Sequence, residues 1–150
     1  MDSTNRDTGD QYMKFKFDEI QNAFDFVSCA PYGENEAFLR KDTGEIFFLS
    51  SLGDSDEFTD EDRDSKESVN LPHKNDLDLG NQLAFDFVRT HLPADYDRVR
   101  RIFSSRGAYA RFKQYLESKR KLQAWYDFEN AAQEKALREW CQESGIELED

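Results

Sequence analysis

The sequence predicts an α+β fold, in which a short antiparallel β-hairpin or three-stranded sheet packs against an N-terminal helix and a C-terminal group of about four helices. Apolar residues recur at helical spacing after residue 17, two aromatic-rich runs flank a short turn at 42–44, and helical periodicity returns after residue 75. The length of 150 residues suits one domain. We expect that domain at 14–148, after a disordered polar tail at 1–13.

The first expected element is an amphipathic helix. Its apolar face repeats every three or four residues, at Phe17, Ile20, Phe24 and Val27. Pro31 and Gly33 are residues that end a helix. The sequence therefore predicts a helix of about three turns before residue 31.

A β-hairpin is expected next. The runs 37–41 and 45–49 flank Asp42-Thr43-Gly44, a short turn that begins with Asp and ends with Gly. Gly44 is suited to the positive φ that such a turn needs. Residues 69–72 can add a third strand, with Pro72 at an edge or a strand end.

Residues 53–68 are expected to form a flexible acidic loop, because they hold too little apolar surface to offset the entropy of ordering. The alternative is an acidic interaction segment anchored by Phe58.

Four helices are expected in the second half of the chain. The first is capped by Asn75 or Asp76 and runs to about His91, and the second begins at Pro93. The third follows a break at 104–107, and the fourth runs from about Leu122 to Glu143 and ends at Gly145. The residues expected on their inner faces are Leu83, Ala84, Phe87, Val88, Tyr96, Val99, Phe103, Tyr109, Phe112, Leu116, Leu122, Trp125, Tyr126, Ala136 and Trp140.

The two cysteines and two histidines match no metal-ligand spacing, and no cofactor motif appears, so we expect neither a metal nor a cofactor. Cys29 and Cys141 are expected to be free thiols, although a bridge between them is the alternative. His73 and His91 are interpreted as packing residues. A Cys–His pair stays open, since such partners meet in space.

Charge is divided along the chain. Residues 1–88 hold 21 acids and 8 bases, while residues 89–150 hold 11 acids and 12 bases. The net charge of −12 excludes a generally basic nucleic-acid binder. No apolar run reaches the roughly 20 residues of a membrane span, and no secretory signal opens the chain, so we expect no membrane contact and a cytoplasmic location.

One carboxylate falls inside an aromatic stripe. At about 100° per residue, Glu129 lies between Trp125 and Tyr126 on the last helix. Such a group is a candidate acid, base or ligand contact, with Tyr109 nearby. The interpretation that we favour is a salt bridge to a base of the neighbouring helix, such as Arg106 or Arg111, or a carboxylate that reaches the edge of the stripe.

The segment 100–121 holds eight bases against Glu117 alone. Arg111 and Lys113 fall on opposite rims of their helix, so they form no single cationic stripe. We interpret these bases mainly as rim residues whose stems cover the apolar seam. The candidate binding residues are Arg106, Arg111, Lys113, Trp125, Tyr126 and Glu129.

The favoured function is a non-enzymatic interaction or regulatory protein that offers its acidic segment, 54–67, to a basic protein surface. The alternative is RNA, DNA or anion binding through Arg100, Arg101, Arg106, Arg111, Lys113, Lys119, Arg120 and Lys121. DNA mimicry by the acidic segment ranks third. An enzyme using Glu129 beside Trp125, Tyr126 and Tyr109 also stays open, as does the oligomeric state.

Three blocks of the sequence resemble an uncharacterised bacterial protein family, numbered 0158. They are Ala37-Phe38-Leu39-Arg40-Lys41-Asp42-Thr43-Gly44-Glu45-Ile46, Gly107-Ala108-Tyr109-Ala110-Arg111-Phe112-Lys113, and Leu122-x-x-Trp125-Tyr126-x-Phe128 with Ala136, Trp140 and Gly145-Ile146. Arg40, Lys41 and Glu129 depart from that pattern in charge. The resemblance covers about residues 15–148 and implies an α+β cytoplasmic bacterial protein, without implying an activity.

Overall fold

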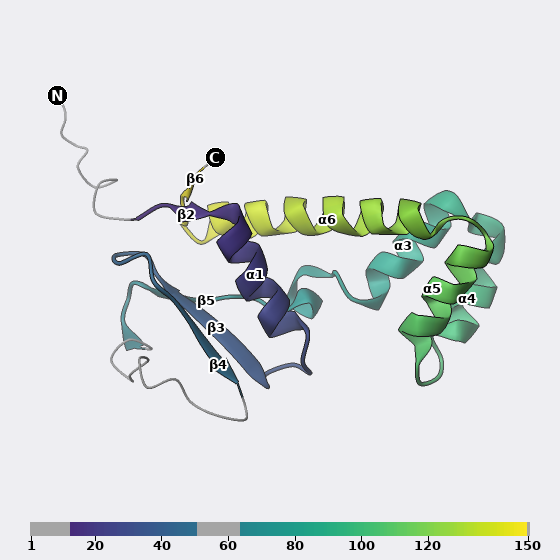
Figure 1. Ribbon diagram of the computed structural model, residues 1–150, viewed down its shortest axis with the longest axis horizontal. Helices are drawn as coiled ribbons and strands as arrows, with labels where there is room; N and C mark the ends of the chain where they lie inside the picture. Colours follow the sequence, from purple (N-terminus) through teal and green to yellow (C-terminus); the bar gives the residue numbers. More distant parts are fainter. Residues whose placement is uncertain (1–12, 51–63, 150) are drawn as a thin grey trace. The chain divides into compact units, whose positions relative to one another are not determined.

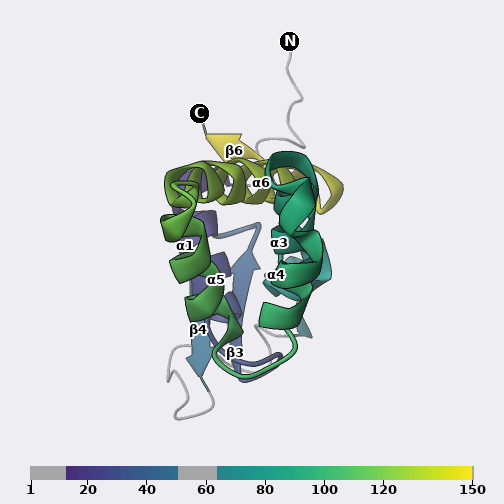
Figure 2. The same ribbon diagram turned by 90° about the vertical axis from the view of Figure 1, so that its right-hand side faces the viewer.

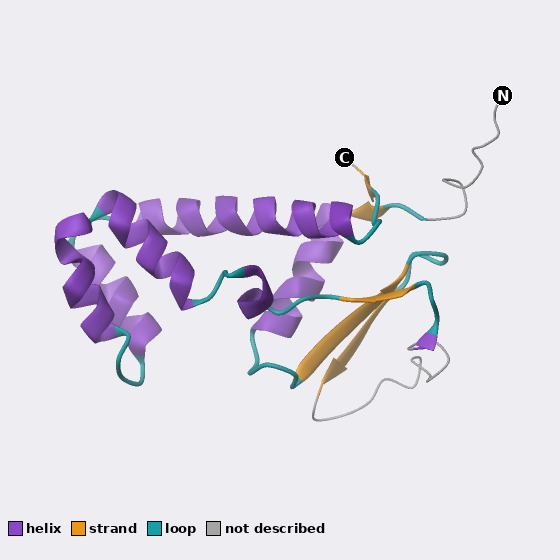
Figure 3. Cartoon of the chain, turned by 180° about the vertical axis from the view of Figure 1, so that it is seen from behind, coloured by secondary structure: helices purple, strands orange, loops and turns teal. Residues whose placement is uncertain are grey.

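The computed structural model describes residues 13–50 and 64–149 of the chain. They form an α+β fold, as the sequence predicts, and divide into two compact units. The sheet unit comprises residues 1–74 and 136–150, and the helical unit comprises residues 75–135. Figure 3 shows that the strands belong to the sheet unit. The expectation of one cooperative domain over 14–148 stays a prediction.

The sheet unit contains two small sheets. Strands β3 (Asn35–Arg40), β4 (Ile46–Ser50) and β5 (Ser68–Asn70) form an antiparallel sheet in the order β4-β3-β5. Strands β2 (Phe15–Lys16) and β6 (Leu148–Glu149) pair in parallel. The third strand of the larger sheet is confirmed, one residue earlier than expected.

Helix α1 (Phe17–Ser28) lies beside the larger sheet (Figure 1). Its buried face carries Ile20, Ala23, Phe24 and Val27, so three of the four predicted positions are confirmed as buried. Phe17 is partly exposed and packs under the guanidinium of Arg138, which lies 4.5 Å from its ring centroid. At the other end of the helix, the ring of Phe26 meets that of Phe48 edge-on at 5.2 Å.

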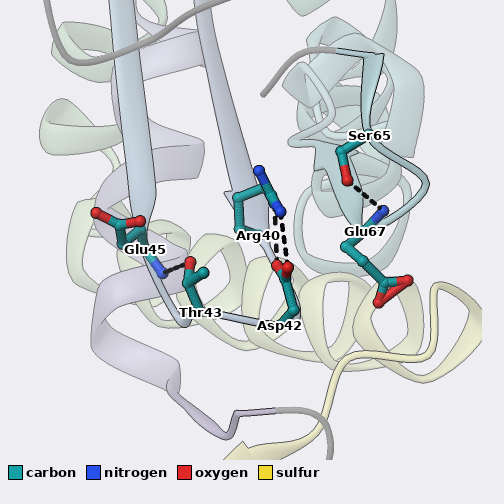
Figure 4. A network of polar contacts seen from close by, with 6 residues as sticks. All are labelled: Arg40, Asp42, Thr43, Glu45, Ser65 and Glu67. Carbon is teal, nitrogen blue, oxygen red and sulfur yellow. Dashed lines mark hydrogen bonds and ion pairs between the residues drawn. The ribbon is translucent and has the colours of Figure 1, made fainter. Parts of the chain in front are cut away.

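The turn between β3 and β4 has the predicted geometry. Gly44 has a φ of 81°, a conformation that favours glycine, and its amide donates to the Arg40 carbonyl at 2.8 Å. Figure 4 shows the polar contacts of the turn, in which the Arg40 guanidinium donates two hydrogen bonds to the Asp42 carboxylate. Those bonds hold the pKa of Asp42 below its usual value.

Two expectations fall mainly outside the described residues. The disordered tail at 1–13 is described only at Met13, whose side chain is half exposed. Of the flexible loop at 53–68, only 64–68 are described, and Ser68 already belongs to β5. Beside that strand, the Ser65 hydroxyl accepts a hydrogen bond from the Glu67 amide at 3.1 Å (Figure 4).

The helical unit is built from α3 (Asn81–His91), α4 (Tyr96–Ile102), α5 (Ala108–Ser118) and the first part of α6 (Leu122–Glu143). Short 3-10 turns at Lys74–Leu77 and Pro93–Asp95 precede α3 and α4. The predicted start of the first helix at Asn75 or Asp76 is therefore wrong. The backbone turns to positive φ at Asp78, which interrupts the helix, and α3 begins only after Gly80.

The core of the helical unit is aromatic. Its buried residues are Leu83, Ala84, Phe87, Val88, Val99, Phe112, Leu116 and Trp125, all predicted from helical spacing. Tyr96 and Phe103 pack against this core while staying partly exposed. Figure 2 shows α4 and α5 as the two arms of a helical hairpin, closed at one end by the turn between them.

Helix α6 has the predicted bounds, and its last turns belong to the sheet unit. There it buries Leu137 and Cys141, whereas Trp140 is only partly buried. Gly145 follows with a φ of 73°, as expected of a glycine that ends a helix.

Arg120 ends α5 in the left-handed conformation, with a φ of 60°. The Lys121 amide donates to the Leu116 carbonyl at 2.8 Å, which is the helix-ending bond for which glycine is preferred. Arg120→Gly is therefore expected to raise the free energy of unfolding by about 0.5–1 kcal/mol, because glycine relieves the strain at a small entropic cost.

Urea unfolding followed by circular dichroism measures this effect. The matched control is Glu117→Gly, within the regular helix, which is expected to lower the free energy of unfolding by about 1 kcal/mol. If both glycines destabilise the protein equally, the strain assigned to Arg120 is wrong.

Candidate nucleic-acid interface

The basic residues of the helical unit gather on a helical hairpin. We call residues 96–121 the basic hairpin: it contains α4, α5 and the turn after each helix. Val99 is fully buried against the core, so the neighbouring side chains of Arg100 and Arg101 face outward and are exposed. Burial of one face of a short helix thus fixes two guanidinium groups on the opposite face.

An open hollow of about 360 Å³ lies along this outer face. It is lined by Asp97, Arg100, Arg101 and Ser104, which are spaced three, one and three residues apart and so share one side of the helix. The sequence analysis did not single out this group, although the spacing of its polar residues is visible in the sequence. We call it the arginine hollow.

The arginines of the hollow form no ion pair with an acid among the described residues. Within residues 13–50 and 64–149, neither Arg100 nor Arg101 forms an ion pair or a hydrogen bond through its guanidinium, and nor does the exposed Arg106. Elsewhere in the same protein, Arg40 and Arg89 pair with Asp42 and Asp86, at 2.6 and 3.0 Å. Three exposed guanidinium groups of the basic hairpin thus have no partner within the part of the chain that the structure describes.

Two predicted binding residues, Arg111 and Lys113, form contacts within the basic hairpin. Arg111 donates through Nη2 to the Ser105 hydroxyl at 2.5 Å and to the Ile102 carbonyl at 3.4 Å, which braces the turn between α4 and α5. Lys113 places its ammonium 4.9 Å from the centroid of the Tyr109 ring. Of the three predicted bases, only Arg106 lacks such an internal contact among the described residues.

Glu129 has a different partner from the one expected. The Tyr109 hydroxyl donates to Glu129 Oε2 at 3.1 Å and accepts a hydrogen bond from Trp125 Nε1 at 3.3 Å. No described residue forms a salt bridge with Glu129, so the favoured pairing with Arg106 or Arg111 is wrong. A tyrosine one helix away satisfies the carboxylate instead.

Tyr109 itself is 44% exposed, so its predicted inward orientation is wrong. Partial burial raises the pKa of its hydroxyl; the hydrogen bond from Trp125 opposes this rise, and the negative charge of Glu129 adds to it. The tyrosine is therefore a protonated donor to Glu129 at neutral pH.

Trp125 and Tyr126 lie in different surroundings. Trp125 is 2% exposed and belongs to the core, so it presents almost no surface to a ligand. Tyr126 is partly exposed and lines a second open hollow, of about 330 Å³, with Glu117, Arg120, Leu122 and Gln123. The six candidate residues thus do not converge on one site.

The ring of Tyr115 in α5 contacts Arg98 of α4, a contact between helices that was not predicted from the sequence. Arg98 and Lys119 lie 5.1 and 5.7 Å from the centroid of its ring, and Lys119 reaches the Asp95 carboxylate at 3.9 Å. The Tyr115 hydroxyl is buried and has no hydrogen-bond partner of good geometry among the described residues. Its burial, together with the nearby charge of Asp95, raises its pKa.

Both cysteines are free, as predicted. Burial raises the pKa of the Cys141 thiol to about 11, while Cys29 is exposed. His73 is buried and bonds the Ala30 carbonyl at 3.0 Å, and His91 stacks on Phe87 with ring centroids 4.4 Å apart. Across the described ranges, acidic, cysteine and histidine side chains do not gather into a group that could hold a metal ion.

No protein-family model, curated protein or solved structure matches this chain. The resemblance to the 0158 family therefore stays a prediction. Among the described residues, every helix is too short or too polar to cross a membrane.

Proposed function

We propose that this protein is a non-enzymatic cytoplasmic interaction protein whose partner is a single-stranded nucleic acid, held by the basic hairpin. The observation that carries the proposal is the exposure of Arg100, Arg101 and Arg106 without a carboxylate partner among the described residues. A guanidinium is planar and donates to phosphate oxygens in pairs, so exposed arginines suit a phosphate backbone.

The acidic composition of the whole chain is compatible with this role, because the charges are segregated. The helical unit carries 11 Lys and Arg against 9 Asp and Glu, and the rest of the chain carries 9 against 23. At physiological salt a charge acts over about 8 Å, so the local arrangement on the basic hairpin outweighs the net charge.

The other interpretations have less support. The acidic segment 54–67, proposed to contact a basic protein surface, lies outside the described residues except at its end, so that partner stays a prediction. An enzymatic role for Glu129 depends on a carboxylate that a tyrosine hydroxyl already occupies.

The experiment is fluorescence anisotropy of the full chain with a labelled oligouridylate of about 20 nucleotides, enough to cover a typical single-strand site. Affinity is expected to fall with salt, and a logarithmic plot should have a slope of about −2, because each of three phosphate contacts contributes about −0.7. Absence of binding at low salt, or an affinity that salt does not change, would contradict the proposal.

A further inference from the structure

An acid stands among the arginines of the hollow. Asp97 precedes Arg100 by three residues and Arg101 by four, positions that are neighbours on a helix surface. Its carboxylate nevertheless forms no ion pair or hydrogen bond with any described residue. With respect to residues 13–50 and 64–149, the hollow therefore presents an unoccupied acceptor beside two unoccupied donors.

Ser104 adds a second acceptor. Its hydroxyl donates its only proton to the Arg101 carbonyl at 2.6 Å, which leaves the oxygen lone pairs for a ligand. At about 100° per residue, Asp97 and Ser104 fall between Arg100 and Arg101, so the hollow places two oxygen acceptors between two guanidinium groups. A phosphate group alone does not satisfy this combination, because the Asp97 carboxylate repels it.

A ribose with the two phosphates that flank it satisfies both sets of groups. The phosphates accept from the guanidinium groups, and the 2′-hydroxyl supplies a donor that deoxyribose lacks. We propose that the arginine hollow discriminates RNA from DNA, with Arg100 and Arg101 on the two flanking phosphates and Asp97 accepting from the 2′-hydroxyl. This inference rests on the proposed function and assigns the chemical class of its ligand.

The specificity follows from the cost of an unpaired carboxylate. When DNA occupies the hollow, the ligand offers no hydroxyl donor to the Asp97 carboxylate. The repulsion between this carboxylate and the phosphates is then uncompensated, so DNA binding is weakened. When RNA occupies it, the hydrogen bond to a charged acceptor contributes about tenfold in affinity. Removal of the carboxylate should therefore lower the affinity for RNA and raise the affinity for DNA.

The test compares oligouridylate with oligodeoxyuridylate of equal length, which carry the same base and differ in the 2′-hydroxyl. The wild-type protein is expected to bind the RNA about tenfold more tightly. In Asp97→Ala the affinity for the DNA should rise severalfold, that for the RNA should fall, and the ratio should approach one. Circular dichroism checks that the variant keeps its helices.

Asp127→Ala is the matched control. It removes an exposed acid from the same unit but outside the basic hairpin, so the preference for RNA should persist. Equal wild-type affinities for the two oligonucleotides, or a preference that survives in Asp97→Ala, would overturn the inference and leave the proposed function standing. Absence of binding to both would overturn the proposed function as well.

Discussion

Trp125→Ala is expected to lower the free energy of unfolding of the helical unit by about 3–5 kcal/mol. The indole is 2% exposed, and its ring lies 5.4 Å from Phe87, 5.2 Å from Phe112 and 6.3 Å from Phe128, measured between centroids. Truncation would remove contacts with residues of α3, α5 and α6 together. It would also remove the indole hydrogen bond to Tyr109.

Chemical unfolding followed by far-ultraviolet circular dichroism measures this loss. The control is Trp140→Ala, since Trp140 is only partly buried and belongs to the sheet unit. Its truncation should cost less than half as much, because less apolar area leaves contact with the protein. Equal losses in the two variants, or a loss below about 1 kcal/mol in Trp125→Ala, would show that Trp125 does not organise this core.

Much of this core was predictable because a helix repeats every 3.6 residues. The inner face of α3 and the buried Phe112 and Leu116 of α5 all follow from spacing alone. The hairpin was equally visible, since Gly44 marks the one position of its turn that needs positive φ. These features depend on local geometry, which the sequence contains directly.

Features that depend on neighbouring elements were not predictable. Spacing places Tyr109 on the same face as Phe112, yet its hydroxyl reaches Trp125 and Glu129 while its ring stays half exposed. The first turn of the expected helix at Asn75 is broken by Asp78, whose positive φ no sequence rule requires of aspartate. In both cases the contacts of the folded chain override the periodic pattern.

The sequence predicted which charged residues belong to the candidate site, but it did not predict the contacts that their side chains form. A helical wheel gives the direction of Arg111 and Lys113 but not the reach of their long side chains, which turn back to Ser105 and to the Tyr109 ring. The arginine hollow was not predicted, although the expected burial of Val99, which the structure confirms, already places Arg100 and Arg101 on the outward face of α4. The absence of partners for Arg100 and Arg101 among the described residues is a property of the fold.

The triple variant Arg100→Glu, Arg101→Glu and Arg106→Glu is expected to weaken oligouridylate binding by about a hundredfold at low salt. Each reversal removes a donor to phosphate and places a repelling charge where an attracting one stood. The slope of the salt dependence should approach zero as the three phosphate contacts disappear. Stability should change little, because all three side chains are exposed and their guanidinium groups form no ion pair or hydrogen bond with described residues.

The matched control is Lys14→Glu, Lys74→Glu and Lys135→Glu. These lysines are exposed and lie outside the basic hairpin, and their reversal changes the net charge of the chain by the same amount. A binding site that depends on the local arrangement of charge should lose far less in this control than in the arginine variant.

The most direct test asks whether Arg100, Arg101 and Arg106 hold a phosphate backbone. It is the ratio of the dissociation constants for oligouridylate in the two triple variants, measured at low salt. We expect the arginine variant to bind at least about tenfold more weakly than the lysine variant. Equal affinities in the two proteins would mean that net charge alone governs the interaction, and would contradict a built site on the basic hairpin.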